Sequence, residues 1–128
     1  MAFWSKKKLF DILMKNFKND NISVEFEENR LTFEMYFEEA KFNLYPYIKL
    51  DENESIMSIF VNIRKIEKEN VYEKINNFNL ISKYFTLKLK DNVLYLEYNA
   101  FVDNDNVYDV TKKATDALND LQLEIDKI

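Results

Sequence analysis

The sequence predicts a single α+β domain over residues 1–128, in which helices pack on one face of an antiparallel sheet. Apolar residues alternate with polar ones over short runs joined by two-residue turns, which is typical of antiparallel strands. Over three other segments they recur every three or four residues, which is typical of helices. Hydrophobic residues make up 47% of the chain, enough for one folded core. The expected order is helix, four strands, helix, two strands and helix.

The first predicted elements are a helix over residues 5–19 and a hairpin. Apolar residues recur along the helix at helical spacing, and Ser5 is suited to cap its first turn. Large residues then alternate with polar ones over residues 22–26 and 31–37. A two-residue turn at residues 28–29 places all of these large residues on one face of the hairpin. The expected cross-strand pairs are Phe26–Leu31, Val24–Phe33 and Ile22–Met35.

A third and a fourth strand extend this predicted sheet. A turn at Glu39 and Ala40 returns the chain beside the second strand. The expected pairs are Phe37–Phe42, Met35–Leu44 and Leu31–Ile48. Pro46 cannot donate a ladder hydrogen bond, so we expect a kink there. After an acidic turn, alternation over residues 56–63 predicts the fourth strand.

The second half of the chain is predicted to supply two helices and another hairpin. Helical spacing predicts one helix over residues 69–82 and a longer one over residues 106–127. Between them, residues 85–98 form a hairpin around Asp91 and Asn92, a pair that tolerates left-handed backbone. The expected cross-strand pairs are Phe85–Tyr98, Leu87–Leu96 and Leu89–Leu94.

The composition excludes several kinds of chemistry. The chain has no glycine, so no glycine-rich phosphate loop can form. It has no histidine and no cysteine, which excludes a histidine-based triad, a thiol nucleophile and an ordinary zinc site. We therefore expect a protein that has no enzymatic activity and binds no cofactor or metal.

The charge and the overall bias of the composition bear on partners and location. A net charge of −5 argues against binding to nucleic acid, because such binding depends on clustered cations. We find no signal-like segment and no membrane-spanning apolar run, so the cytoplasm is the expected location. The abundance of Lys, Asn, Ile, Phe and Tyr beside absent glycine is also what an AT-rich genome produces.

Several local motifs resemble functional signatures but have a structural explanation. Residues 5–8 match the S-x-x-K spelling of a serine nucleophile, yet its companion motifs are missing and helix capping explains Ser5. Residues 103–106 begin like a calcium loop but lack its glycine and final glutamate, so capping of the last helix by Asp105 or Asn106 explains them better. Outward carboxylates on the strands fit a solvated surface better than a Mg²⁺ site. These carboxylates are Glu25, Glu27, Glu34 and Glu38.

Residues 75–79 (Ile-Asn-Asn-Phe-Asn) form an apolar-Asn-x-x-Asn element, which a polar-turned hairpin and a closing amphipathic helix follow. In this pattern and in element order, the chain resembles the YbjN-like family, whose fold is similar to that of the class I type III secretion chaperones. The resemblance is strongest over residues 50–125. It implies a small acidic domain that often dimerises and binds other polypeptides without chemistry. The chain departs from the family pattern because its second hairpin has no glycine.

The amides of Asn76 and Asn79 share a face of the predicted helix. They could bind the end of a neighbouring strand or a peptide backbone. We favour a local structural role, because buried amides usually satisfy nearby backbone groups.

The predicted binding site is the second face of the four-strand sheet. If Phe33, Leu44 and Ile59 face the helices, five large residues on the same segments point the other way. These residues are Tyr36, Tyr45, Tyr47, Ile56 and Phe60. A contiguous aromatic patch is usually an interface, and tyrosine is enriched in binding surfaces. The alternative is that a helix covers this face or that the five residues lie singly among charges.

These features predict a protein-binding domain of chaperone-like or adaptor type that forms a homodimer. One alternative is a small phage- or mobile-element-type inhibitor that occludes a host defence enzyme, which needs the same size, acidity and aromatic residues. Another is a peripheral membrane protein that uses Phe3, Trp4 and the Lys6–Lys8 run, which combine interfacial aromatic and basic residues. We favour membrane contact less, because the same helix can dock on the sheet.

Overall fold

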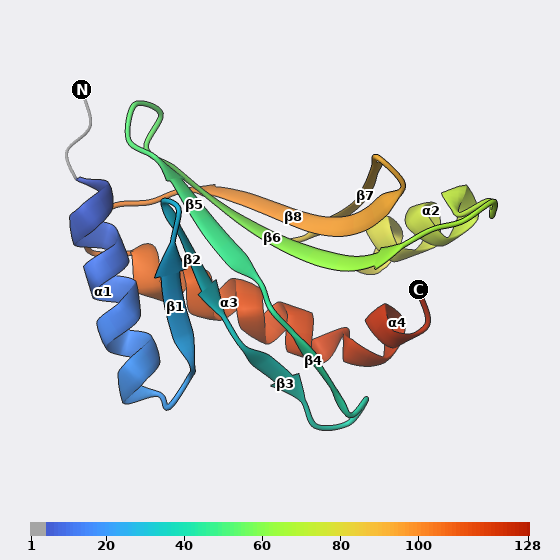
Figure 1. The fold of residues 1–128 in the computed structure, drawn as a ribbon, viewed down its shortest axis with the longest axis horizontal. Coiled ribbons are helices and arrows are strands. Elements are labelled where there is room, and N and C mark those ends of the chain that lie inside the picture. The colour runs from blue at the N-terminus through green and yellow to red at the C-terminus, as the bar shows by residue number, and fades with distance from the viewer. Residues whose placement is uncertain (1–4) are drawn as a thin grey trace.

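Four helices and eight strands make up the described part of the chain, residues 5–128, in the computed structural model (Figure 1). The helices are α1 (Lys6–Asn19), α2 (Tyr72–Ile81), α3 (Val107–Asp120) and α4 (Gln122–Asp126). The strands are β1 (Val24–Glu27), β2 (Arg30–Phe33), β3 (Met35–Phe37), β4 (Phe42–Leu44), β5 (Tyr47–Asp51), β6 (Ile56–Lys65), β7 (Thr86–Lys90) and β8 (Val93–Phe101). The predicted α+β class is confirmed. The strands outnumber those expected because two predicted strands are each interrupted.

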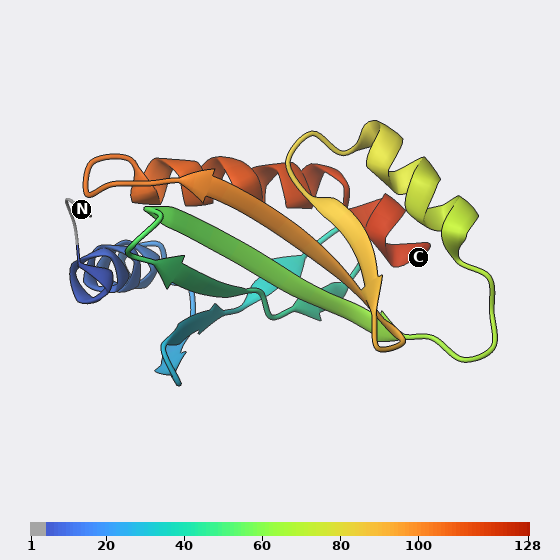
Figure 2. The ribbon, with the colours of Figure 1, turned by 90° about the horizontal axis from the view of Figure 1, so that it is seen from above.

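Six of the strands form one antiparallel sheet in the order β1-β2-β5-β6-β8-β7, and β3 and β4 form a separate two-stranded ribbon. Helix α3 runs along one face of the large sheet, with α1 beside it and α2 at the β7 end (Figures 1 and 2). Strand residues that point toward the helices are buried. They include Leu31, Ile48, Met57, Ile59, Leu87 and Leu96. The opposite face of the sheet is open.

Local sequence signals explain the first helix and hairpin. The Ser5 hydroxyl oxygen accepts a hydrogen bond from the Lys8 amide (3.2 Å), which confirms Ser5 as the cap of α1. Glu28 and Asn29 have left-handed backbone, with φ of 50° and 65°, as a tight two-residue hairpin turn requires. The pairs Phe26–Leu31 and Val24–Phe33 are confirmed.

The third predicted pair of this hairpin, Ile22–Met35, is wrong. The Ile22 amide donates to the Phe17 carbonyl (2.8 Å), so it closes the turn after α1 instead of entering the ladder. Met35 pairs with Leu44 in the β3–β4 ribbon.

Pro46 lies at the predicted kink. It separates β4 from β5, and its carbonyl accepts a hydrogen bond from the Phe33 amide (3.0 Å). The β3–β4 ribbon therefore extends away from the large sheet (Figure 1). The predicted pairs Phe37–Phe42, Met35–Leu44 and Leu31–Ile48 are confirmed.

Strands β6 and β8 join the two halves of the large sheet. They pair from Ile56 and Phe101 at one end to Lys65 and Val93 at the other. The β7–β8 hairpin has the predicted register across residues 91–92. Its confirmed pairs are Leu87–Leu96 and Leu89–Leu94.

The helix predicted over residues 106–127 is interrupted at Leu121, where α3 ends and α4 begins. Gln122 is buried at this break and links two parts of the fold. Its side-chain amide donates to the Asn119 carbonyl (3.0 Å), and its side-chain oxygen accepts from the Ala40 amide in the β3–β4 turn (2.8 Å). The interruption therefore connects the end of the helix to the ribbon.

The turns contain left-handed backbone without any glycine. Eight described residues have positive φ, and each of them carries a side chain. They are Asn21, Glu28, Asn29, Lys41, Ser55, Lys68, Asp91 and Asn92.

Asn79 closes the edge strand β7. Its side-chain amide donates to the Leu87 carbonyl (3.1 Å), and its side-chain oxygen accepts from the Leu87 amide (2.7 Å). Unpaired backbone groups on an edge strand are a template for aggregation. The structure therefore supports the local role that we favoured for Asn79.

Replacing Asn79 with alanine is expected to lower the free energy of unfolding by about 1–3 kcal/mol, because both Leu87 backbone groups lose their partner. Urea denaturation measures this loss. Asn76→Ala is the matched control, since Asn76 lies exposed on the same helix. Equal losses for the two variants would contradict the role of Asn79.

Candidate functional site

The open face of the six-stranded sheet carries a row of three aromatic rings, which we call the aromatic row. Tyr47 on β5 lies opposite Phe60 on β6, and Tyr95 follows on β8. The Tyr47 and Phe60 rings are stacked with centroids 5.3 Å apart, and the Phe60 and Tyr95 centroids are 6.5 Å apart. All three side chains are partly exposed. The aromatic row therefore crosses three neighbouring strands.

Two cations lie over the aromatic row. The Arg30 guanidinium carbon is 4.7 Å from the centroid of the Tyr47 ring. The Lys49 ammonium is 5.9 Å from the centroids of both Tyr47 and Phe60. These are cation–π distances, so the rings hold the two charges in place on the open face.

A shallow hollow of about 570 Å³ lies beside the aromatic row. The three rings line it together with polar side chains such as Asn62 and Glu97. Because the Tyr47 and Phe60 rings stack on each other, each ring covers one face of the other. The hollow therefore offers a partner ring edges, the cations Lys49 and Lys90, and the carboxylates Asp91 and Glu97.

The structure brings together two of the five predicted site residues, Tyr47 and Phe60. Ile56 is on the same strand as Phe60 but lies at its far end, opposite Phe101, which is 75% exposed. Tyr45 is exposed in the break between β4 and β5, and within residues 5–128 no ring contact joins it to the aromatic row.

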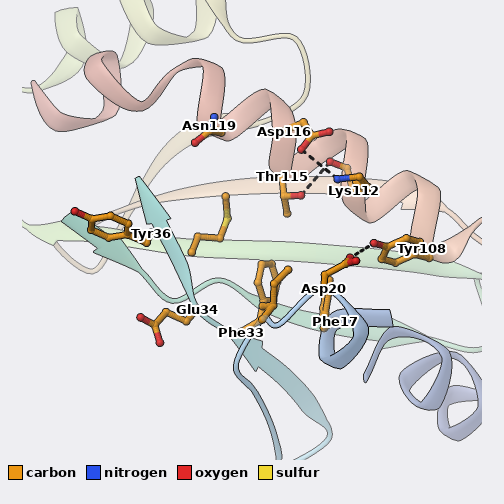
Figure 3. Close-up of a pocket in the computed structure, with 12 residues that line it drawn as sticks. Phe17, Asp20, Phe33, Glu34, Tyr36, Tyr108, Lys112, Thr115, Asp116 and Asn119 are labelled. Carbon is orange, nitrogen blue, oxygen red and sulfur yellow. Dashed lines mark hydrogen bonds and ion pairs between the residues drawn. The ribbon is translucent and has the colours of Figure 1, made fainter. Parts of the chain in front are cut away.

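Tyr36 lies elsewhere, at a second hollow between the β3–β4 ribbon, the end of α1 and α3 (Figure 3). This hollow measures about 260 Å³, and Phe17 and Phe33 are among its apolar lining residues. The polar groups around it are already paired with one another or with neighbours. The pairs are Tyr108–Asp20, Lys112–Asp116 and Asn43–Glu34. These groups are thus satisfied without a ligand, and the aromatic row is the stronger candidate site.

The Tyr108 hydroxyl donates a hydrogen bond to the Asp20 carboxylate (Figure 3). This bond stabilises the neutral phenol and, with burial, raises the pKa of Tyr108 from 10.0 to about 12. Because the folded-state pKa is the higher one, the resulting stability is complete below pH 10.0 and is lost as the pH rises to about 12.

We therefore expect the difference in unfolding free energy between wild type and Tyr108→Phe to shrink as the pH rises from 10.0 to about 12. Urea denaturation at stepped pH measures this difference. Tyr72→Phe, at an exposed tyrosine, is the control and is expected to show no such trend. A difference for Tyr108→Phe that is independent of pH would contradict the prediction.

Sequence reasoning missed Tyr95 and Arg30 as site residues. Alternation with Leu94 and Leu96 indicates that Tyr95 points outward from the second hairpin, but the sequence does not show which strand lies on the other side of β8. The connection from β6 to that hairpin passes through α2, so no short turn fixes the register. Arg30 lies opposite Glu27 in the β1–β2 ladder. The contact between Arg30 and Tyr47 depends on the pairing of β2 with β5.

The motifs that resembled functional signatures take structural positions. Asn106 is the N-cap residue of α3, as predicted, but its side chain makes no capping hydrogen bond to that helix and accepts one from the Asp103 amide (2.8 Å). The Asp103 side chain in turn accepts hydrogen bonds from the amides of Asp105 (2.8 Å) and Asn106 (2.9 Å), and this forms a turn before the helix. Among residues 5–128, no group of three or more carboxylates is arranged to hold a metal ion.

The predicted membrane contact falls partly outside the described residues. Phe3 and Trp4 precede residue 5, where the description of the structure begins. Lys7 and Lys8 are exposed at the start of α1, and Lys6 is partly buried. No helix in residues 5–128 is both long and apolar enough to cross a bilayer.

Comparison with known proteins adds no relative. No model of a protein family matches the chain, and a search of curated proteins gives no match either. The likeness to the YbjN-like family therefore stays a prediction, and the open face of the sheet is the main indication of function.

Proposed function

We propose that this protein binds another protein through the open face of its six-stranded sheet, without enzymatic activity of its own. The observation that carries the proposal is the aromatic row, three contacting rings with two cations over them on a face that the helices leave open. Tyrosine and arginine are enriched among the residues that dominate binding energy at protein interfaces. The buried opposite face of the sheet gives these side chains a rigid support.

The role that we propose is that of a chaperone-like or adaptor domain. The resemblance to the YbjN-like family supports this role, because it implies a domain that binds polypeptides without chemistry. An inhibitor of a host defence enzyme would use the same surface. The class of the bound partner separates the two roles, since a secreted or unfolded client indicates a chaperone and a defence enzyme indicates an inhibitor.

Affinity capture from host lysate with matched baits tests the proposal. The baits are the wild type, Phe60→Ala and the control Tyr72→Ala, which truncates an exposed tyrosine on α2 away from the open face. We expect quantitative mass spectrometry to find partners that the wild type and Tyr72→Ala retain and Phe60→Ala loses. Retention of every partner by Phe60→Ala would contradict binding at the aromatic row.

We also propose that the protein forms a homodimer, as the family resemblance implies. Large apolar side chains are exposed at the end of α2, where Leu80 is 84% exposed and Ile81 is 50% exposed. Sedimentation velocity is expected to show a dimer at micromolar concentration. A strict monomer at high concentration would count against both the dimer and the chaperone-like role.

A further inference from the structure

Arg30 and Lys49 form no ion pair within residues 5–128, although Glu27 lies opposite Arg30 in the β1–β2 ladder. The ion pairs of residues 5–128 join Arg64 to Glu69, Lys88 to Glu97 and Lys112 to Asp116, and none of them involves Arg30 or Lys49. The Arg30 Nε atom is buried and makes no hydrogen bond. Within residues 5–128 only three of the 18 Lys and Arg residues form ion pairs, so what distinguishes Arg30 and Lys49 is that both lie over the aromatic row.

The two cations also lie close to each other. Arg30 and Lys49 contact the same Tyr47 ring, and the β2–β5 register, in which Leu31 faces Ile48, brings them side by side. Like charges on neighbouring strands destabilise a sheet. A carboxylate bound between them would relieve this repulsion by pairing with both cations.

At the other end of the aromatic row, side chains of both charges line the hollow. Glu97 forms an ion pair with Lys88 (3.4 Å) and accepts a hydrogen bond from Asn99 (2.7 Å). A carboxylate of a partner therefore meets two cations at the Arg30 end and mixed charges at the other end, and the rings between them offer contact to apolar groups.

We propose that the open face binds an acidic segment of a partner protein, with a carboxylate between Arg30 and Lys49 and an apolar side chain beside Phe60 and Tyr95. This inference rests on the proposed function and adds the chemistry of the partner. Single-stranded nucleic acid fits less well, because it needs ring faces for base stacking and a continuous basic track. Here the Tyr47 face is covered by Arg30, and Glu97 and Asp91 lie along the same hollow.

A peptide-binding experiment tests this inference. The probe is a short blocked peptide that repeats Glu-Ser-Leu-Ser, which places glutamate and leucine on the same side of an extended chain. Its counterpart carries glutamine in place of glutamate, and oligothymidylate is the third probe. With the full chain, we expect the glutamate peptide to bind about tenfold more tightly than the glutamine peptide, and Lys49→Gln to remove most of that preference. Lys113→Gln, at an exposed lysine on α3, is the control for charge and should not change it.

The inference is wrong if neither peptide binds, if both bind equally, or if Lys113→Gln has the effect of Lys49→Gln. If oligothymidylate binds and Lys49→Gln weakens that binding, the ligand of the open face is nucleic acid and not an acidic protein segment. Phe60→Ala separates this inference from the proposed function. If Phe60→Ala weakens peptide binding and Lys49→Gln does not, the face binds protein but does not select acidic partners. If neither variant weakens binding, both proposals fail.

Discussion

Replacing Phe33 with alanine is expected to lower the free energy of unfolding by about 3–5 kcal/mol. Phe33 is 2% exposed and contacts Phe17 of α1, with ring centroids 4.9 Å apart. Removal of its ring leaves a cavity between the sheet and the first helix. The free energy gained by burying the apolar ring is lost as well. Urea denaturation measures the change. Coincident transitions followed by two different spectroscopic probes verify two-state unfolding.

Phe60→Ala is the matched comparison, because it removes the same side chain from the open face. Phe60 is partly exposed and loses mainly its ring contacts, so we expect a change of about 1 kcal/mol. If Phe60→Ala destabilises the protein as strongly as Phe33→Ala does, the face is covered in solution and the proposed site is wrong.

The largest effect on binding is also expected at the aromatic row. Phe60→Ala or Tyr47→Ala should weaken the affinity for the captured partner by about 2 kcal/mol or more, because each ring lies in the centre of the proposed interface. In terms of dissociation constants this is about thirtyfold. Titration calorimetry with the purified partner measures the effect.

Tyr45→Ala provides the contrast for this measurement. Tyr45 belongs to the originally predicted patch and is 58% exposed, but it makes no ring contact with the aromatic row in the described chain. We expect its truncation to leave the affinity within about threefold of the wild type. A loss equal to that of Phe60→Ala would show that the interface extends to the β4–β5 break.

The sequence allowed the fold class and the hairpins to be predicted because their determinants are local. Alternation and two-residue turns fix the register of β1 with β2 and of β7 with β8, since one slip would expose every large side chain. The interruption near Pro46 also has a local determinant, because proline has no amide hydrogen to donate to the strand ladder. The wrong pair Ile22–Met35 depended on the end of α1, whose hydrogen bond to Ile22 the alternation does not reveal.

The candidate site was harder to predict because it combines strands that are distant in sequence. Tyr47 and Phe60 come from strands joined by one turn, so outward alternation identified both. Tyr95 and Arg30 join them through the β6–β8 and β2–β5 pairings, which long connections leave undetermined. Tyr36 follows the break between β2 and β3, and Tyr45 lies in the break between β4 and β5, so counting alternate residues past those breaks no longer gives the face.

The left-handed turns without glycine bear on how this chain can evolve. Glu28, Lys41 and Lys68 have φ of 50°, 62° and 48°, and a residue with a Cβ atom pays about 1–2 kcal/mol in that conformation. Glycine would remove this strain with the same turn geometry. The bias toward Lys, Asn, Ile, Phe and Tyr is what an AT-rich genome produces, and such a bias accounts for the missing glycine without any role in binding. In a less AT-rich lineage, descendants of this gene should acquire glycine at these three positions first, while the sheet and its open face stay unchanged.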